Sequence, residues 1–383
     1  MTVAIVGVGH TSFQSTTPDI SFKEQMFEAA VKAYEDAGVN PRKDIASFLT
    51  AAEDYYEGYS IFDEFVPDQL GAVLRPVCTI GGDGLLALIN GVMQIETGLF
   101  DVVAIEAHSK ASDILTFPGI VTHGLDPIYN RAFNVHPYFV AGLEMRRYLH
   151  ETGTTREQCA AVVVKNKQNA LSNPSAAFAA KMTMDDVMNS EFVSDPLTRR
   201  DISPLADGVI VMVLASEEKA KKLSDHPVWL KGVGWCSDTP WIESRTWSAA
   251  EYARLAAERA YKMAGIKNPQ KQIAFAEVDD WFSYKELQHI EALGLCENGE
   301  AGKLSEQGNF SRNGKLPVNV SGGRIGAGNL LEASALQSVL ECVLQLQGRA
   351  GTRQMKDAEM AVAQSWRGVP TATGCVAVLS SEL

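Results

Sequence analysis

The sequence lacks any Cys-x-x-Cys pair, although it has six cysteines in 383 residues. Their scattered spacing argues against a zinc site and does not suggest a disulfide framework. No two of the seven histidines have metal-ligand spacing either. We therefore expect no metal and no bound cofactor, and one reactive thiol among buried ones. The cysteines are Cys78, Cys159, Cys236, Cys296, Cys342 and Cys375.

Long apolar runs are also missing. No run reaches the roughly 18 residues that a membrane-spanning helix needs. Residues 1–9, MTVAIVGVG, have no basic flank and no cleavage site, so they predict a first β-strand and not a signal peptide. These absences predict a cytoplasmic protein that does not associate with a membrane.

Basic residues are outnumbered. The 34 Lys and Arg residues against 47 Asp and Glu residues give a net charge of −13. This balance argues against nucleic acid as the main partner. It leaves room for an anionic small molecule, because a local basic patch or a helix N-terminus can bind phosphate on an acidic protein.

Length and apolar content predict a two-part α/β protein. The chain exceeds one ordinary core of roughly 100–200 residues, and 46% of it is hydrophobic. The order strand–helix–strand–helix–strand occurs twice, in residues 1–223 and 224–383, and each half opens with a strand that runs into Gly-Val-Gly. We expect two similar halves with parallel-type sheets covered by helices.

The hydrophobic pattern places the expected elements. Residues 113–205 break the alternation and are interpreted as a cap inserted over a site, and the acidic, aromatic residues 54–68 as a structured loop. Expected strands cover residues 3–8, 48–52, 75–78, 102–105, 209–215, 227–233, 273–278, 361–364 and 375–379. Expected helices cover residues 22–37, 85–97, 217–223, 249–264, 282–293 and, after a Gly-rich turn, residues 322–346.

The first candidate for chemistry is Cys78, in the run RPVCTIGGDG at residues 75–84. A cysteine between a strand and a helix lies where free backbone N–H groups converge, and the helix dipole favours its thiolate. The same N–H groups can stabilise an oxyanion of a thioester. The alternative is a small buried cysteine with no chemical role. The spacing alone favours the alternative, and the three glycines and the helix start that follow bring the two interpretations closer to even.

Two further runs could contribute to a site. NVSGGRIGAGNLLE at residues 319–332 has four glycines in seven residues, typical either of a loop that contacts a ligand through its backbone or of a helix start. EVDDWFS at residues 277–283 puts two carboxylates at a strand end, where α/β proteins bind ligands. Helix capping is the alternative, about even for Asp279 and favoured for Asp280. From the cap, His123 and His136 can reach a site, although a structural role is commoner for each.

Together these motifs resemble the thiolase superfamily. Cys78-Thr-Ile-Gly-Gly resembles its nucleophile motif, Asn319-Val-Ser-Gly-Gly its Asn-Pro-x-Gly-Gly, and Asp207-Gly the start of the strand after the cap. KNKQNA at residues 165–170 resembles the sterol-carrier-protein-type branch with its archaeal and bacterial relatives, which include a thiolase that splits benzoylsuccinyl-CoA. The match runs in order over essentially the whole chain and implies a five-layered αβαβα fold.

The sequence departs from the family at its histidines. The Gly-His-Pro motif reads Gly-Asn-Leu at residues 328–330, and the His-Asp-Cys-Phe motif of this branch reads Asp-Asp-Trp-Phe at residues 279–282. The late Cys-Gly-Gly motif is missing, and Ser-Trp-Arg-Gly at residues 365–368 lies near its place.

The resemblance nevertheless implies roles for individual residues. Cys78 would form the acyl-enzyme, and Asn329 would hold the carbonyl oxygen. Asp279 would move the proton if burial raised its pKa. His136 is a spare candidate base. The glycines expected to bind substrate are Gly323, Gly328 and Gly368.

By this resemblance the chain is expected to be an acyl-CoA C-acyltransferase. It would make or cleave a carbon–carbon bond in a β-ketoacyl-CoA, with coenzyme A as substrate and an unusual, branched or aromatic acyl group. One alternative is a retro-aldolase acting on a β-hydroxyacyl-CoA, which needs no cysteine. Another is a non-catalytic acyl-CoA-binding subunit.

The resemblance also implies partners. Thiolases generally dimerise, so a homodimer core is expected. Relatives in this branch often pair with a small subunit built from a zinc ribbon and an OB-fold. Because this sequence has no zinc-ligand cluster, any zinc would belong to that partner.

Overall fold

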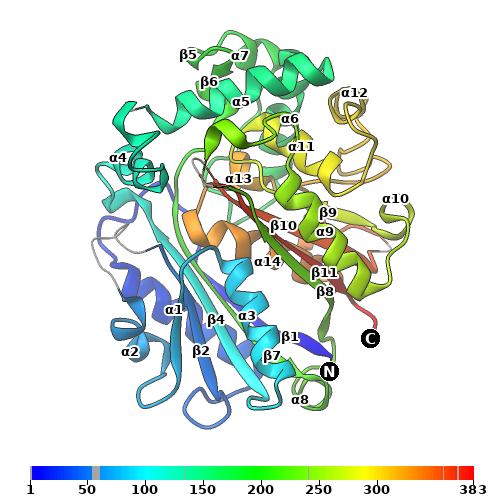
Figure 1. Cartoon of the computed structure of the whole chain (residues 1–383). Coiled ribbons are helices and arrows are strands. Elements are labelled where there is room, and N and C mark those ends of the chain that lie inside the picture. The colour runs from blue at the N-terminus through cyan, green and yellow to red at the C-terminus, as the bar shows by residue number, and fades with distance from the viewer. Residues whose placement is uncertain (1, 54–60, 134, 240, 357, 369–370) are drawn as a thin grey trace.

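The computed structural model describes residues 2–53, 61–133, 135–239, 241–356, 358–368 and 371–383 (Figure 1). Part of the acidic, aromatic loop expected at residues 54–68 lies outside the described residues. No helix in the described ranges is long and apolar enough to cross a membrane.

Nine strands form one mixed sheet in the order β3-β2-β4-β7-β1-β8-β11-β10-β9. The two halves join where β1 pairs with β8 through three residue pairs. The strands are β1 (Val3–His10), β2 (Ser47–Ala51), β3 (Val77–Ile80), β4 (Val102–Lys110), β7 (Asp207–Ser216), β8 (Val228–Ser237), β9 (Phe275–Glu277), β10 (Met360–Arg367) and β11 (Thr373–Ser380).

The expectation of two parallel-type sheets is therefore wrong in two respects. The sheet is continuous, and among the described strands only the pairs β2–β3, β2–β4 and β9–β10 are parallel. Strands β10 and β11 follow each other after a short connection, which permits only antiparallel pairing, since a parallel pair needs a long crossover. The alternation of strands and helices is thus a guide to parallel pairing only where a helix crosses over.

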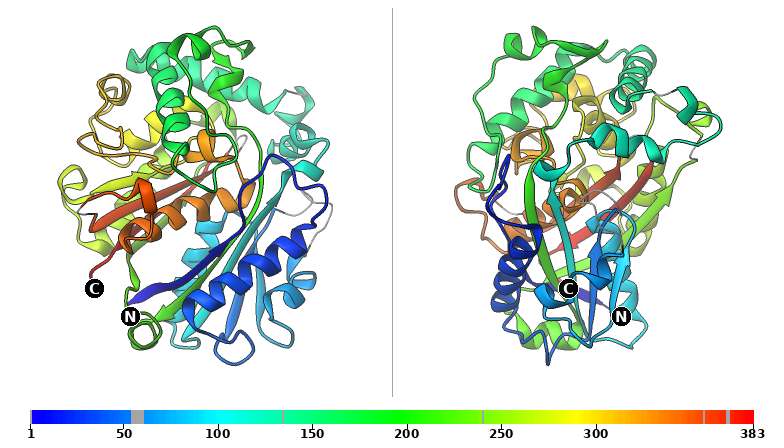
Figure 2. Two further views of the ribbon diagram at one scale, coloured as in Figure 1. Left: turned by 180° about the vertical axis from the view of Figure 1, so that it is seen from behind. Right: turned by 90° about the vertical axis from the view of Figure 1, so that its left-hand side faces the viewer.

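Helices and sheet stack in five layers (Figure 2). Helix α1 (Phe22–Ala37) covers the outer face of the N-terminal half, and α9 (Glu251–Ala264) covers the outer face of the C-terminal half. Helices α3 (Gly84–Glu96) and α14 (Ser334–Leu346) share a core with strands of both halves, and so form the central layer. This is the expected αβαβα arrangement.

The sequence of strand β7 is almost continuously apolar, and its surroundings explain why. Successive side chains point to opposite faces of a sheet, and helices cover both faces here. Its side chains toward α1 are Val209, Val211, Val213 and Ala215. Those toward the central layer are Ile210, Met212 and Leu214.

The Gly-Val-Gly runs of the two halves have a packing role. A Cβ atom at Gly7 would lie 2.6 Å from that of Ala37 in α1, and one at Gly232 would overlap the carbonyl oxygen of Ala260 in α9. The repeated glycines let the outer helix of each half approach its sheet closely. The one residue-level repeat in the sequence therefore reflects the shared architecture.

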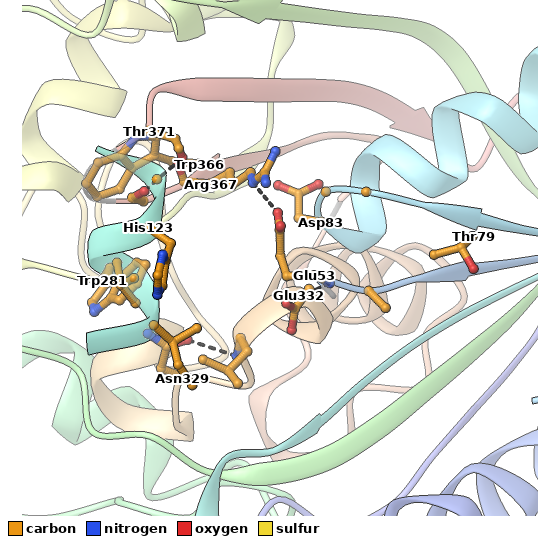
Figure 3. Close-up of a pocket in the computed structure, with 18 of the residues that line it drawn as sticks. Glu53, Thr79, Asp83, His123, Trp281, Asn329, Glu332, Trp366, Arg367 and Thr371 are labelled. Carbon is orange, nitrogen blue, oxygen red and sulfur yellow. Dashed lines mark hydrogen bonds and ion pairs between the residues drawn. The ribbon is translucent and has the colours of Figure 1, made fainter. Parts of the chain in front are cut away.

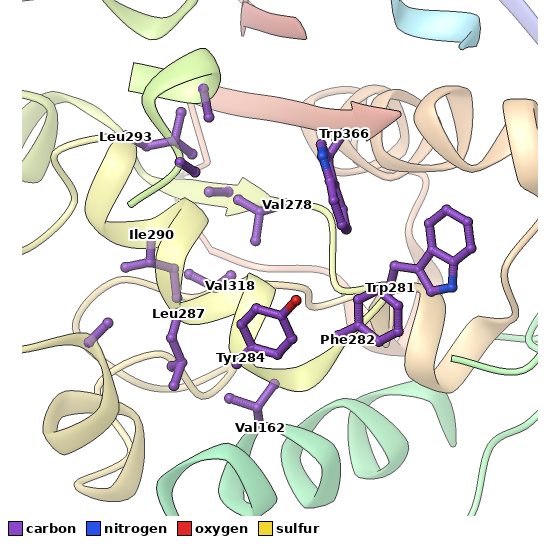
Figure 4. Packing of buried hydrophobic residues seen from close by; sticks show 14 of the residues in the cluster. Val162, Val278, Trp281, Phe282, Tyr284, Leu287, Ile290, Leu293, Val318 and Trp366 are labelled. Atoms are coloured by element: carbon purple, nitrogen blue, oxygen red, sulfur yellow. The ribbon is translucent and has the colours of Figure 1, made fainter. Parts of the chain in front are cut away.

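Residues 111–206, between β4 and β7, form the expected cap. Its helices α4 (Phe117–Val121), α5 (Pro137–Thr152), α6 (Arg156–Ala170) and α7 (Met184–Met188) accompany the short pair β5 (Phe192–Ser194) and β6 (Leu197–Thr198). Although the N-terminal half carries it, the cap shares its core with the C-terminal half, where Val162 packs in one cluster with Leu287 and Val318 (Figure 4). The C-terminal helices on this side are α11 (Ser283–Ala292), α12 (Ala301–Glu306) and α13 (Gly323–Ala327).

Three further short α-helices are α2 (Pro67–Leu70), α8 (Glu217–Leu223) and α10 (Pro269–Gln272). The boundary that we expect after residue 223 coincides with the end of α8, between β7 and β8, and stays a prediction.

Candidate active site

A cavity of about 1010 Å³ opens where both halves and the cap meet. Strands β2 and β3 are parallel, so their carboxyl ends lie together and place Glu53, Thr79 and Asp83 on one side of it. The cap contributes the turn around His123. The C-terminal half contributes Asn329, with Trp281, Arg324, Leu331, Glu332, Trp366, Arg367, Gly368 and Thr371 (Figure 3).

Asn329 is buried at the cavity wall and held from three sides. Its side-chain oxygen accepts hydrogen bonds from the N–H of Leu331 at 3.0 Å and from the hydroxyl of Ser334 at 3.2 Å. Its amide nitrogen donates to Ser203 at 3.2 Å. Because a primary amide has two N–H bonds, one remains to bind a ligand oxygen. The geometry agrees with the expected role in holding a carbonyl oxygen, which stays a prediction.

Asp279 lies behind the cavity wall. Its carboxylate forms an ion pair with Arg324, which lines the cavity, and accepts a hydrogen bond at 2.9 Å from the N–H of Trp281. Burial raises the pKa of Asp279, while the guanidinium of Arg324 acts in the opposite direction. Asp279 is not among the residues that line the cavity, so the structure brings it to the site through Arg324.

Asp280 has the capping role that the sequence favours. Its carboxylate accepts hydrogen bonds from the N–H groups of Arg324 at 2.6 Å and Ile325 at 3.1 Å, at the start of α13. Burial, with Glu286 nearby, raises the pKa of Asp280 to about 7. The neighbouring Gly323 has a φ of 58°, and a Cβ atom there would lie 2.6 Å from the carboxyl carbon of Asp280. Gly323 therefore serves this turn and does not line the cavity.

Cys78 does not lie at the junction of strand and helix that the sequence pattern predicts. Strand β3 continues to Ile80, and the cap residue of α3 is Asp83, so Cys78 lies within the strand and not at the helix N-terminus. Thr79 lines the cavity, and alternation along a strand directs Cys78 to the opposite face. Its side chain is exposed. No cysteine is among the cavity-lining residues in the described ranges.

Of the other expected site residues, Gly368 lines the cavity, whereas Gly328 and His136 do not. Gly368 lines the cavity, and any side chain there would overlap the indole of Trp281. Gly328 ends α13 with a φ of 114° and does not line the cavity. His136 is exposed and caps α5, where its ring accepts a hydrogen bond from the N–H of Tyr138 at 3.1 Å. The structure therefore does not bring His136 to the site.

Several residues that line the cavity were not expected from the sequence. Glu53 and Arg367 form an ion pair across the cavity, from the two halves of the chain. Asp83 combines a place in the wall with capping of α3, through a 2.9 Å hydrogen bond from the N–H of Leu86. Arg324 lay inside the Gly-rich motif. The available signal was a single arginine between glycines, in a chain that also has two adjacent carboxylates at an expected strand end.

Two tryptophans form the apolar wall. The rings of Trp281 and Trp366 are 6.1 Å apart, and the rings of Trp281 and Phe117 from the cap are also 6.1 Å apart. The buried ammonium of Lys285 lies 4.2 Å from the ring of Trp366, and Trp366 sits at the end of the apolar cluster drawn in Figure 4. The wall is therefore fixed by contacts to both the cap and the C-terminal core. Within the described residues no group of three or more His, Cys, Asp or Glu could hold a metal ion.

Comparisons with known proteins agree with this architecture. Residues 234–381 match the family described as thiolase C-terminal domain-like. The acetyl-CoA acetyltransferase of Methanothermobacter thermautotrophicus is 33% identical over 374 residues, 96% of each chain. The chain belongs to the thiolase superfamily. The sterol carrier protein 2 of Oryctolagus cuniculus, 30% identical over 94% of this chain and 69% of its own, places it in the expected branch.

A solved thiolase-like structure is similar over nearly the whole chain. The Ltp2–ChsH2(DUF35) aldolase has a TM-score of 0.85 and 25% identity, with 99% of this chain and 97% of that chain covered. The names of the sequence relatives support an acyl-CoA acyltransferase as the class of enzyme. The structural relative is an aldolase, so members of this fold carry out both kinds of reaction.

Proposed function

We propose that this thiolase-superfamily chain makes or breaks a carbon–carbon bond next to the thioester of an acyl-CoA, in the cavity between its halves. Coenzyme A enters as part of the substrate and not as a resident cofactor. The names of the relatives support this class of substrate. The cavity supports it chemically, because it combines a positioned amide donor with acid–base groups and an apolar wall.

The amide of Asn329 supplies electrostatic stabilisation. Breaking a bond beside a thioester leaves negative charge on the thioester oxygen, as an enolate. A donor that is already fixed in place stabilises such an oxygen without reorganisation. The hydrogen bonds to Leu331, Ser334 and Ser203 fix the amide in this way.

The reaction that the geometry supports best is of the aldol type, on a β-hydroxyacyl-CoA. The observation that carries it is the absence of a thiol from the described cavity wall. Aldol cleavage needs a base and a place for the enolate oxygen, but no covalent nucleophile. The similarity to the Ltp2–ChsH2(DUF35) aldolase favours the same choice.

Thiolase-type acyl transfer is the second candidate, and the names of the sequence relatives favour it. In that reaction Cys78 would carry the acyl group and Asp279 would move the proton. For this, Cys78 would have to turn from the exposed face of β3, and Asp279 would have to leave its ion pair with Arg324.

The walls suggest the acyl group. Trp281, Trp366, Ile120 and Val121 offer flat and branched apolar surface, which suits a branched or aromatic acyl chain. A cytoplasmic location, a homodimer core and a small partner with a zinc ribbon and an OB-fold remain part of this proposal. The Ltp2–ChsH2(DUF35) aldolase carries the names of two components, which favours a partner chain.

The test uses paired β-hydroxyacyl- and β-ketoacyl-CoAs with branched and aromatic acyl groups, on the purified chain and on Cys78→Ala. Liquid chromatography with mass spectrometry follows the release of a shorter acyl-CoA, and the intact protein mass reports any adduct. The aldol-type reaction predicts cleavage of the hydroxy substrate without added coenzyme A, unchanged by Cys78→Ala, and no adduct. Cleavage of the keto substrate that needs coenzyme A, with an acyl adduct lost in Cys78→Ala, would replace it by thiolase chemistry. Cys236→Ala, at a partly exposed cysteine that does not line the cavity, is the control.

A further inference from the structure

We propose that His123 of the cap is the general base and acid of the reaction in this cavity. The inference rests on the proposed function and extends it to the proton that every such carbon–carbon step must move. His123 lies in the inserted cap, outside the two motifs at residues 279–282 and 328–330 that differ from the family pattern.

Of the seven histidines, all within the described ranges, His123 is the one that lines the cavity. Its ring lies in the same part of the cavity as Trp281 and Asn329 (Figure 3). The ring makes no hydrogen bond to any residue of the described ranges, whereas His289 is buried between the Tyr252 hydroxyl and the backbone oxygen of Asp279. His123 is therefore placed to exchange a proton with a ligand.

The other acid–base groups of the site are committed to structure. Asp279 is paired with Arg324, and Glu53 is paired with Arg367. Asp83 accepts a hydrogen bond from the N–H of Leu86 as the cap of α3, and Asp63 accepts one at 2.8 Å from the hydroxyl of Thr79. Glu332, which also lines the cavity, accepts a hydrogen bond at 3.1 Å from the N–H of Glu53. Using any of them as a base would break a contact that holds the wall.

The turn that carries His123 is itself anchored. It follows α4, whose Phe117 packs against Trp281, and its Val121 is buried in the core shared with the C-terminal half. Arg131 donates a hydrogen bond at 2.7 Å to the backbone oxygen of His123 and another at 3.2 Å to that of Leu125. The backbone is thus fixed, while the exposed ring stays in contact with solvent protons at the open side of the cavity.

The proposed step balances. The neutral imidazole takes the proton of the β-hydroxyl group as the carbon–oxygen bond becomes a carbonyl. The Cα–Cβ bond breaks, and its electron pair forms the enolate of the thioester. The enolate oxygen accepts a hydrogen bond from the side-chain N–H of Asn329. The imidazolium then returns the proton to Cα, which leaves a ketone or aldehyde and a shorter acyl-CoA. In thiolase-type transfer the same imidazole would exchange the α-proton.

The test isolates proton transfer from bond cleavage. Propionyl-CoA is incubated with the protein in D₂O, and mass spectrometry measures deuterium entering Cα. We expect His123→Asn to slow the exchange at least about 10²-fold, the lower end of the range for general acid–base catalysis. His136→Asn, also an exposed histidine of the cap, is the matched control, because Asn retains the helix cap at that position. It should exchange within about twofold of the unmodified chain.

Added imidazole distinguishes a catalytic role from a structural one. Because the ring of His123 is exposed, free imidazole can enter the space left in His123→Ala and should restore part of the exchange. Three outcomes would overturn the inference. The first is exchange at the original rate in His123→Asn, and the second is loss of exchange in His123→Ala that added imidazole does not restore. The third is an unmodified chain that does not exchange the Cα protons. Exchange that depends on His123 without cleavage of any substrate would support the inference and refute the proposed function.

Discussion

The two segments that border the cavity come from equivalent places in the two halves and differ in how firmly they are held. Residues 79–83 include the end of β3 and the turn before α3, and β3 is an edge strand whose four side chains are all partly or fully exposed. Residues 319–331 precede α14, as residues 79–83 precede α3, and are buried throughout. The N-terminal segment contributes the half-buried Thr79 and one buried carboxylate, Asp83. The C-terminal segment contributes an amide and an arginine that the core holds in place.

The difference suggests a division of labour. Where the backbone is buried and fully bonded, a side chain can be aimed precisely, as stabilisation of an enolate oxygen requires. Where it is exposed, the sequence can change at little cost in stability. On this view the protein tolerates Cys78 outside the site because the amide that stabilises the enolate oxygen comes from the C-terminal segment.

The largest expected effect comes from Asn329→Asp. Aspartate keeps the oxygen that accepts from Leu331 and Ser334, but it loses the N–H donor and adds a negative charge beside the enolate. Removal of one oxyanion donor costs about 10²–10³-fold in kcat, so a fall of that size is expected. Steady-state kinetics on the substrate that is found to be cleaved measures it, with Ser203→Ala as the control for loss of a neighbouring hydrogen bond. Activity within threefold of the unmodified chain would remove Asn329 from the mechanism.

A pair of glycine substitutions compares the segments directly. Gly323→Ala forces a side chain into the left-handed region and against Asp280, for which we expect a loss of about 2–4 kcal/mol in the free energy of unfolding. Gly81→Ala meets nothing within 4 Å and needs no positive φ, so the change should stay within about 0.5 kcal/mol. Urea denaturation measures both. Equal losses would mean that the N-terminal segment is as constrained as the C-terminal one.

A smaller effect is expected from Glu277→Gln. Glu277 ends β9 and accepts hydrogen bonds from the N–H of Ser321 at 3.1 Å and from its hydroxyl at 2.5 Å. Burial, with Glu341 nearby, raises the pKa of Glu277 to about 8. The unfolded chain releases this proton near pH 4.3 while the folded chain keeps it, so the free energy of unfolding falls as pH rises from about 4.3 to about 8.

Glutamine does not titrate, so the pH dependence of stability in Glu277→Gln should be flatter over this range. Thermal unfolding at a series of pH values measures it. Glu218→Gln, on the exposed face of α8, should leave the shape of the curve unchanged. A curve for Glu277→Gln that parallels the unmodified chain would show that Glu277 is not the group that titrates.

Local pattern predicted most of the architecture. Helix α1 has the bounds expected from its apolar spacing, and the structure shows the capping box of Ser21 at one end and the left-handed Gly38 at the other. The five layers and the αβαβα arrangement followed from the resemblance. The pairing direction was mispredicted, since it depends on connections across the sheet that local pattern does not contain.

The site was less predictable for a related reason. The motif around Cys78 gave the residue types correctly, but the strand continued two residues further than expected, and this turned the thiol out of the cavity. Asn329 and Gly368 were found because they lie in motifs. Glu53, Arg367 and Arg324 act through partners that are distant in sequence, and only the folded chain brings them together.

The central place of β1 has a consequence for how the chain acquires its structure during synthesis. Its neighbours in the sheet are β7 and β8, which begin about two hundred residues later. At about 5–20 residues per second, this apolar strand waits on the order of ten seconds or more for both partners to leave the ribosome. Until then it is an unpaired edge, so the newly made N-terminal half is the stage at which a chaperone would protect this protein most.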